Sequence, residues 1–347
     1  MESSLTVIEN ARGDLALSED LIGVTKAFMV EARSESTRRA YGRAWRSFEN
    51  WCAAQGRHHM PASPETVAAW LSAMATGIGH AKPLARASIN QALSAVLLAH
   101  RTAGTPIDRK HPLIAETWRG ISRVKAKSDV VRKARPVLGS DLSTMLDSFG
   151  QKPIDIRDRA LLSIGWAGAL RRSELVGLDW QRLGSGQGFV SVDDEAVTIT
   201  LATSKASQDE AVTIVVPRAD MRTAVSALLA WVELAGVSAG EPIFRPVDQH
   251  GHIGTSRLTD HSVSRIIKSR VAKYARKRGN GKQAAKDMAA AFSGHSLRAG
   301  FVTTAARNKI PSYDIRNHTR HKSVQTVEGY IREADKLTDS VLKGIGF

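Results

Sequence analysis

Two histidines, an arginine and a tyrosine follow one another in the C-terminal part of the chain. His295 and Arg298 are three residues apart, His321 lies further on, and Tyr330 is nine residues after His321. A guanidinium group can bind phosphate oxygens in a forked geometry, imidazoles can transfer protons, and a phenolic oxygen can act as a nucleophile. These residue types in this order could therefore carry out nucleophilic attack on a phosphodiester without a metal ion.

Each of these residues also has a simpler interpretation. The spacing of His295 and Arg298 places both on one face of any helix, and a single tyrosine in a helical stretch commonly packs in a core or an interface. The ordered set is harder to explain in this way. Only four tyrosines are present, and Tyr330 alone follows both histidines and the arginine. Tyr330 is therefore the candidate nucleophile.

A second arginine and a carboxylate lie earlier in the chain. Arg171 and Glu174 are three residues apart and follow the apolar run LLSIGWAGAL. On an exposed helix they would form an ordinary ion pair worth about 0.3–0.5 kcal/mol. A charge directly after a buried-looking run is unusual for a solvated residue, so Arg171 is a candidate functional arginine. Lys205 lies in the segment SKASQDE, where a lone lysine would ordinarily be solvated.

The elements that must position these residues begin with a helical module. Residues 1–19 are polar and acidic and are expected to be frayed. From 20 to 124 apolar residues recur at helical spacing, which predicts four or five helices and no strand. Residues 125–135, KAKSDVVRKAR, are charged and have no apolar pattern. They predict a basic linker that can neutralise phosphates while two domains close around a duplex.

The second expected domain, 136–347, combines helical patterns with two strand-like segments. AVTITLA and AVTIVVP alternate in β-branched residues, which predicts a small antiparallel sheet in an otherwise helical domain. A tail helix is expected from about residue 334. Its apolar residues could pack on a neighbouring subunit or on their own domain, and they are Leu337, Val341, Leu342 and Ile345.

The charge balance favours a polyanionic partner. Lysine and arginine number 49 against 34 acidic residues, and the formal net charge is +15. An anionic membrane is the rival partner, but no basic segment has the bulky apolar face of a membrane-surface helix. There is no run of eighteen apolar residues and no secretory signal pattern. The single cysteine excludes a disulfide framework within the chain. We expect a cytoplasmic nucleic-acid-binding protein without a membrane partner.

The basic stretches contain candidate DNA contacts. Three arginines lie opposite the aromatic face of their expected helix, and the Asn and Gln side chains of a later helix could pair with adenine. Ordinary solvated polar residues would explain these positions equally well. The candidates are Arg38, Arg39, Arg43, Arg86, Asn90, Gln91, His261, Arg265 and Lys268.

Three segments carry a resemblance to a known family. GHSLRAG and TRHKSVQTVEGYI resemble the C-terminal signature of the tyrosine recombinase (phage integrase) family, in which His-x-x-Arg, a His or Trp and the nucleophilic Tyr follow in that order. GALRRSEL resembles the first signature box of the family. The order of helical module, basic linker, mixed domain and short tail is similar to that of Cre-type recombinases, so the resemblance covers the whole chain. It implies a SAM-like core-binding domain followed by a mixed α+β catalytic domain.

The resemblance also implies a role for each residue around the phosphate. Tyr330 would attack the scissile phosphate, forming a 3′-phosphotyrosyl bond and releasing a 5′ hydroxyl. Arg171 and Arg298 would bind the non-bridging oxygens and stabilise the transition state. His321 would donate a further hydrogen bond to those oxygens.

The remaining candidates would transfer protons or hold the other site residues in position. On the same resemblance Lys205 would protonate the leaving 5′ oxygen, His295 would take the tyrosine proton, and Glu174 would keep the arginines and histidines in place. No divalent metal would be needed, because the cationic side chains already surround the phosphate. We therefore expect no metal site and no cofactor.

The implied partner is double-stranded DNA carrying specific recombination sites, bound by a homotetramer in a bacterial or phage-encoded, nucleoid-associated system. A type IB topoisomerase would use similar side chains as a monomer without pairing two sites. A DNA-binding protein with a decayed site would form no covalent adduct at all. The target sequence, the biological role and any accessory proteins are left open by the sequence.

Overall fold

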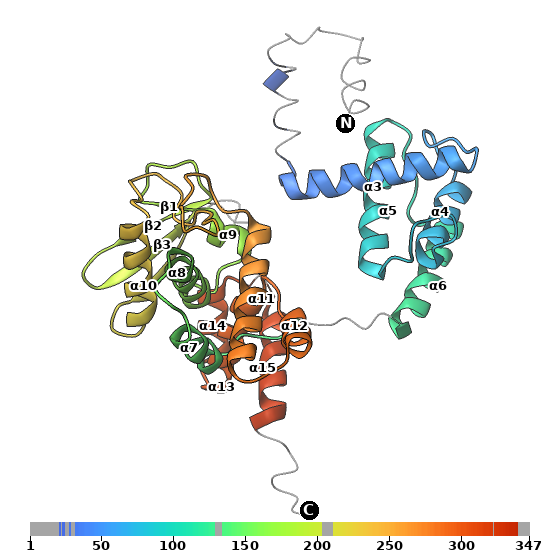
Figure 1. The fold of residues 1–347 in the computed structure, drawn as a ribbon. Coiled ribbons are helices and arrows are strands. Elements are labelled where there is room, and N and C mark those ends of the chain that lie inside the picture. The colour runs from blue at the N-terminus through green and yellow to red at the C-terminus, as the bar shows by residue number, and fades with distance from the viewer. Residues whose placement is uncertain are drawn as a thin grey trace, which may run out of the picture. The chain divides into compact units, whose positions relative to one another are not determined.

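The computed structural model describes residues 21, 23, 24, 28, 32–128, 134–202, 211–321 and 323–338, with backbone alone for 332–338. The chain divides into two compact units, Met1–Val131 and Arg132–Phe347 (Figure 1). Three groups of sequence predictions lie outside the described structure. They are those for residues 1–19, for Lys205, and for the apolar tail side chains of Leu337, Val341, Leu342 and Ile345, of which only the Leu337 backbone is described. No helix within the described ranges is long and apolar enough to cross a membrane.

The described part of the first unit is helical, as its apolar periodicity predicts. Its helices are α3 (Glu35–Ala54), α4 (Pro64–Thr76), α5 (Arg86–Thr102) and α6 (Pro112–Ser128). α4 begins where Ser63 accepts a hydrogen bond from the Thr66 amide and Pro64 occupies the first helical position. α6 continues to Ser128, so residues 125–128, which we expected in the linker, are helical. Lys125 and Lys127 in its last turn suit the negative end of the helix dipole.

One apolar core holds the first unit together. α3 contributes Phe48 and Trp51, α4 contributes Trp70, and α5 contributes Leu93. His100 is buried among them, and its Nε2 accepts a hydrogen bond from the Ala62 amide at 3.0 Å. The aromatic stripe of α3 therefore faces the core and leaves the opposite face of the helix for polar side chains.

The second unit combines nine helices with one small sheet in its described residues. The helices are α7 (Gly139–Asp147), α8 (Pro153–Ala167), α9 (Arg172–Val176), α10 (Arg222–Leu234), α11 (Asp260–Lys277), α12 (Lys282–Ala290), α13 (Ser296–Arg307), α14 (Ser312–Thr319) and α15 (Val324–Thr338). The strands are β1 (Leu178–Trp180), β2 (Gly188–Val192), β3 (Ala196–Leu201) and β4 (Val212–Pro217). The predicted fold class, mainly helical with a small sheet, is confirmed.

The sheet is mixed, so the prediction of a wholly antiparallel sheet was wrong. Strands follow the order β1-β2-β3-β4, with β1 parallel to β2 and the other pairs antiparallel. β3 and β4 are the two alternating segments read from the sequence, with Ile199 opposite Ile214. The strand β1 has only three residues and directly follows a helix, so it is too short to show an alternating pattern.

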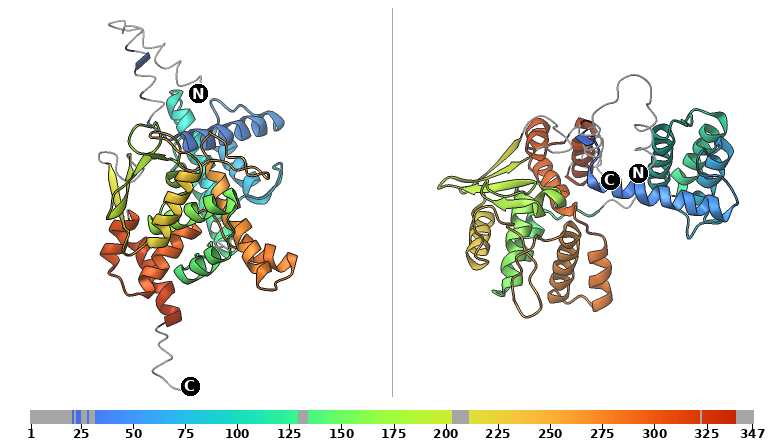
Figure 2. Two further views of the ribbon diagram at one scale, coloured as in Figure 1. Left: turned by 60° about the vertical axis from the view of Figure 1, so that its left-hand side comes forward. Right: turned by 90° about the horizontal axis from the view of Figure 1, so that it is seen from above.

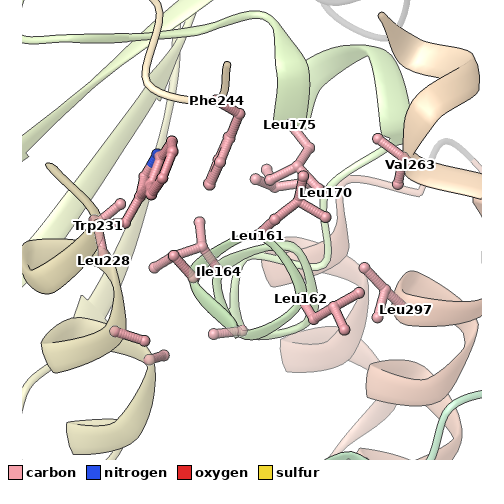
Figure 3. Close-up of a cluster of buried hydrophobic side chains, with 14 of the residues drawn as sticks. Leu161, Leu162, Ile164, Leu170, Leu175, Leu228, Trp231, Phe244, Val263 and Leu297 are labelled. Carbon is pink, nitrogen blue, oxygen red and sulfur yellow. The ribbon is translucent and has the colours of Figure 1, made fainter. Parts of the chain in front are cut away.

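Helix α8 lies at the centre of the second unit. The sheet and α10 lie on one side of it, and α11 to α15 lie on the other (Figures 1 and 2). Leu161, Leu162 and Ile164 point in different directions from α8 and meet side chains from the surrounding elements (Figure 3). At Gly165 an added Cβ would lie 2.8 Å from Leu175 and 2.9 Å from Leu297, so glycine allows close packing there. The apolar half of α8, from Ala160 to Ala167, therefore packs on all its sides, as expected of a helix at the centre of a core.

A buried charge network ties α8 to α11. Arg270 of α11 is buried and binds Asp155 and Asp158 of α8, and its guanidinium carbon lies 4.5 Å from the ring centroid of Phe149. Burial raises the pKa of Asp155, but the hydrogen bond and charge of Arg270 outweigh it and lower that pKa below its ordinary value. Arg270 therefore stabilises the fold, although its sequence neighbours Lys268 and Lys273 are exposed basic residues.

Candidate active site

Arg171 ends the turn that leads from the central helix α8 into α9, and Glu174 lies in the first turn of α9. The backbone conformation of Ala169 is left-handed, with φ 44°, and Arg171 is the N-cap of α9. The Arg171 amide donates to Oε2 of Glu174 at 2.8 Å, while the Arg171 guanidinium binds Oε1. The side chain of Arg171 keeps 32% of its surface exposed, whereas that of Glu174 keeps 9%. Glu174 therefore binds Arg171 from the buried side, while about a third of the Arg171 side chain stays exposed.

Arg298 lies in the first turn of α13 and is buried. Its Nη1 donates to the carbonyl oxygen of Ala169 at 2.8 Å, and its Nη2 donates to the carbonyl oxygen of Thr319. Burial, followed by the charges of Arg171 and Arg320, lowers the pKa of Arg298 to about 9, which leaves the group protonated at neutral pH. The two backbone carbonyls join the start of α13 to the turn before α9 and to the end of α14.

A further buried arginine, Arg320, was missed by sequence reasoning. It follows α14 in a left-handed conformation, with φ 57° and ψ 42°. Its Nη2 donates to Oε2 of Glu174 at 3.0 Å and to the carbonyl oxygen of Ala169 at 3.4 Å. Its Nε has no hydrogen-bond partner among the described residues. The only signal in the sequence was its position directly before His321, which by itself indicates neither burial nor a partner.

His295 is the N-cap residue of α13 and lies at the exposed edge of the group. Loss of hydration through partial burial has the largest effect on its pKa and lowers it below the ordinary value for histidine. The positive charges of Arg298, Arg172 and Arg171 lower it further. The ring is therefore unprotonated at neutral pH, which a proton acceptor requires.

His321 is half-buried beside the same arginines. Its Nδ1 lies 2.6 Å from Oγ1 of Thr319. Burial, followed by the charges of Arg298, Arg171, Arg320 and His295, lowers the pKa of His321 to about 4. The neighbouring His318 was not singled out by the sequence. It is stacked on Phe301, and its Nε2 lies 2.7 Å from the carbonyl oxygen of Ala167.

Tyr330 extends from α15 toward this group. Its ring centroid lies 6.4 Å from that of His321, and its hydroxyl group is near enough to Arg298 for the two to interact electrostatically. The ring packs against a small cluster of buried residues from α13, α14 and α15, namely Val302, Ala306, Ile315 and Val327. One helical turn before Tyr330, Val327 is completely buried, so it anchors this part of α15.

Six of the seven residues predicted to form the site therefore lie together. They come from the α8–α9 turn, the start of α13, the turn after α14, and α15, and they are Arg171, Glu174, His295, Arg298, His321 and Tyr330. The seventh, Lys205, follows β3 and falls within residues 203–210, outside the described structure. Among the described residues no three His, Cys, Asp or Glu side chains form a group that could hold a metal ion.

The predicted DNA contacts lie on surfaces of both units. Most of their side chains are exposed, and Arg38 and Asn90 are half-buried. Several already have partners within the chain: Arg39 binds Glu35, Arg109 donates to Asn90, and Arg265 donates to Ser262. Their contact with DNA remains a prediction.

Comparison with known proteins is consistent with this arrangement. Residues 137–336 match the phage integrase family, and residues 27–101 match the phage integrase N-terminal SAM-like domain. The chain is 31% identical over 347 residues to an integrase/recombinase XerD homolog of Selenomonas ruminantium, an alignment that spans 99% of this chain and 94% of that protein. It is 25% identical over 329 residues to the recombinase Cre of Escherichia phage P1, across 90% of this chain and 88% of that protein.

A solved structure shares the fold. The Tn1549 transposon integrase in complex with transposon right end DNA matches with a TM-score of 0.55 and 13% identity, over 98% of this chain and 99% of that chain. The match to the family over residues 137–336 covers more than half of the present sequence. The chain therefore belongs to the phage integrase family, the tyrosine site-specific recombinases.

Proposed function

We propose that this chain cleaves and rejoins DNA at specific sites through a 3′-phosphotyrosine bond formed by Tyr330. The observation that carries the proposal is the convergence of Tyr330 from α15, His321 from the turn after α14, and Arg298 from α13. A phosphate placed among them would meet the guanidinium groups of Arg171 and Arg298. Their charges would stabilise the negative charge on the non-bridging oxygens in the transition state.

The proton transfers follow from the same surroundings. A tyrosine phenol has an ordinary pKa of about 10 and must lose its proton as it attacks. His295 has a lowered pKa and is unprotonated at neutral pH, so it can accept that proton. Lys205 would protonate the 5′ oxygen that leaves. Because the phosphotyrosine retains the energy of the broken bond, a 5′ hydroxyl of another strand can displace Tyr330 without ATP.

The substrate we propose is double-stranded DNA carrying recombination sites. The net charge of +15 suits a duplex, and the structurally similar Tn1549 integrase was solved in complex with transposon right end DNA. Strand exchange between two sites needs one active tyrosine for each of four strands, so we propose a homotetramer acting on two synapsed sites. This places the chain with the DNA in the cytoplasm of a bacterium, where accessory proteins and nucleoid association are open to experiment.

A covalent-trapping experiment tests the proposal. The purified chain is incubated with duplex fragments from the DNA that flanks its gene, the reaction is stopped with detergent, and protein-linked strands are sequenced at their ends. We expect adducts at defined positions, linked through the 3′ phosphate, with 5′ hydroxyl ends that a kinase can label. Tyr330→Phe should form none. Tyr313→Phe is the matched control, because Tyr313 is 65% exposed on α14, and it should react as the wild type does.

Two results would contradict the proposal. An adduct formed by Tyr330→Phe would exclude Tyr330 as the nucleophile. Relaxation of a supercoiled plasmid at random positions by single molecules, without pairing of two sites, would instead indicate activity of the topoisomerase type.

A further inference from the structure

The hydroxyl group of Thr319 has two close partners. Thr319 is the last residue of α14 and is completely buried. Its Oγ1 lies 2.6 Å from the carbonyl oxygen of Ile315 and 2.6 Å from Nδ1 of His321. Its carbonyl oxygen accepts a hydrogen bond from Arg298. One buried threonine therefore touches two residues of the proposed site.

The position of the hydroxyl proton can be deduced from these contacts. A threonine hydroxyl has a single proton to donate, and a carbonyl oxygen can only accept. If the proton pointed to His321, two oxygen atoms 2.6 Å apart would face each other without a hydrogen between them. The proton therefore goes to the carbonyl oxygen of Ile315. Oγ1 then accepts from His321, and Nδ1 of His321 carries a hydrogen.

This assignment determines the state of the other ring nitrogen. A neutral imidazole has one N–H, so a hydrogen on Nδ1 leaves Nε2 with a lone pair. Nε2 of His321 has no hydrogen-bond partner among the described residues. The pKa of about 4 makes the neutral ring the predominant form in the free protein at pH 7. In that form Nε2 cannot donate to a phosphate oxygen, which is the role expected for His321.

We propose that Thr319 is a positioning residue that holds His321 in its Nδ1–H form, so that His321 donates to the scissile phosphate from Nε2 only after Nε2 has taken up a proton. This inference rests on the proposed function. The proton comes from solvent, one per active site, and converts the imidazole into an imidazolium when the phosphate binds. A phosphate anion would favour that change, since an adjacent negative charge stabilises the protonated ring.

Two substitutions at residue 319 distinguish the effect of the hydroxyl group from the effect of side-chain packing. Thr319→Val keeps the shape and the main-chain carbonyl that binds Arg298, but it removes the oxygen that accepts from His321. Thr319→Ser keeps that oxygen and loses a methyl group. The first measurement is the tautomer of His321 in free protein labelled with ¹⁵N-histidine, with His321→Gln used to assign its signals. We expect Nδ1–H in the wild type and in Thr319→Ser, and Nε2–H in Thr319→Val.

The second measurement is the rate of covalent-complex formation between pH 5.5 and 8, on a nicked duplex that carries a cleavage position mapped as above. His321 is surrounded by Arg171, Arg298, Arg320, His295 and Tyr330. With the pKa of Arg298 at about 9, a series that ends at pH 8 keeps this arginine mostly charged. His295, as proton acceptor, should limit the rate at the acidic end in all variants. On the alkaline side the wild type and Thr319→Ser should lose up to tenfold per pH unit. Thr319→Val should stay flat there, because a neutral ring could then donate from Nε2.

The outcomes distinguish this inference from the proposed function. An Nε2–H tautomer in the wild type, or the same tautomer in Thr319→Val, would overturn the inference. So would a Thr319→Val profile that is lower at every pH but unchanged in shape, since that is the effect of packing alone. If the wild type forms no covalent adduct on any fragment, the proposed function fails, and the tautomer measurement still decides the role of the Thr319 hydroxyl.

Discussion

Arg320 and Glu174 form a buried ion pair in which Nη2 of Arg320 lies 3.0 Å from Oε2 of Glu174. Their side chains are only 5% and 9% exposed. Because Glu174 also binds Arg171, the pair connects the turn after α14 with the start of α9. The Glu174 carboxylate thus binds two arginines. The charge of Glu174 also acts on a third arginine, Arg298, and favours its protonated form.

Removing the guanidinium of Arg320 should therefore loosen Arg171. For Arg320→Ala we expect a loss of about 3–5 kcal/mol in stability, because Glu174 loses one partner of a buried pair. Arg320→Gly should be less destabilising by about 1 kcal/mol, since glycine adopts the left-handed conformation of residue 320 without strain. Both variants should lower the rate of covalent-complex formation at least tenfold. Urea unfolding and the trapping reaction measure the two effects.

Arg320→Lys is the matched control for that prediction. It keeps the positive charge beside Glu174 but cannot reproduce the forked contacts with the carbonyl oxygens of Gly168 and Ala169. We expect it to recover part of the stability. Equal stabilities of Arg320→Ala and the wild type would show that the ion pair contributes nothing to the fold.

Glu174 should make the second unit sensitive to acid. Burial raises its pKa, but the charge of Arg320 and the hydrogen bond and charge of Arg171 outweigh this and lower the pKa below its ordinary 4.5. The unfolded chain therefore binds this proton more readily than the folded one, and the stabilisation, fully present above about pH 4.5, is lost as the pH falls through the lowered value. Glu174→Gln should be less stable at pH 7 and should lose less stability toward pH 3.

The control for this prediction is Glu116→Gln on α6. Glu116 is 64% exposed in its pair with Arg119, so its substitution should leave the free energy of unfolding within about 0.5 kcal/mol of the wild type at each pH. An unchanged acid response in Glu174→Gln would mean that the carboxylate does not gain from its arginine partners.

His321 should make the stability of the second unit depend on pH in a second range, above that of Glu174. Its pKa falls from 6.5 to about 4 on folding, so between these values the unfolded chain binds a proton that the folded chain excludes. Stability contributed by the neutral ring is complete above about pH 6.5 and is lost as the pH falls toward 4. His321→Gln should flatten the fall of the urea midpoint in this range. Bound duplex should reverse the effect, since the phosphate favours the protonated ring, so DNA binding should be accompanied by proton uptake near pH 6.

The sequence predicted the residues of the proposed active site better than the buried residues that hold them in position. His295, Arg298, His321 and Tyr330 could be picked out because their side-chain chemistry and order carry information that survives without a structure. Arg320 and Thr319 could not, because their roles depend on burial, on a left-handed backbone and on contacts with carbonyl oxygens of residues far away in sequence. No pattern of residue types encodes those contacts.

The same distinction holds for the fold. Helices such as α3 and α8 and the pair of β3 and β4 follow from local periodicity, and they were predicted. The parallel pairing of β1 with β2 follows from tertiary packing around α8, since Leu178 is buried in the same core as Leu161. Arg270 could not be distinguished from the exposed basic residues near it in sequence, because its buried acidic partners lie on another helix.

Gly300 of α13 should tolerate no side chain. A Cβ there would lie 1.7 Å from the carbonyl oxygen of Val137. That segment is held by the Val137 amide, which donates to Ser296, and by Trp166, which donates to the Val137 carbonyl oxygen at 3.0 Å. Gly300→Ala should cost at least about 1–3 kcal/mol and slow cleavage, because it displaces the start of α13. Gly120→Ala on α6, with nothing within 4 Å, should instead stabilise the chain by about 0.5–1 kcal/mol.

Two basic residues of α11 should give opposite phenotypes. Lys268 is exposed, whereas Arg270 is buried against Asp155 and Asp158. Arg270→Ala leaves two buried carboxylates without their main partner, so it should lower the free energy of unfolding by about 3–5 kcal/mol. Lys268→Ala should change stability by less than about 0.5 kcal/mol. If the exposed face of α11 contacts DNA, this variant should bind duplex more weakly and show a salt dependence reduced by about one phosphate contact, measured by fluorescence anisotropy across a NaCl series. An unchanged salt dependence would remove Lys268 from the DNA-contacting surface.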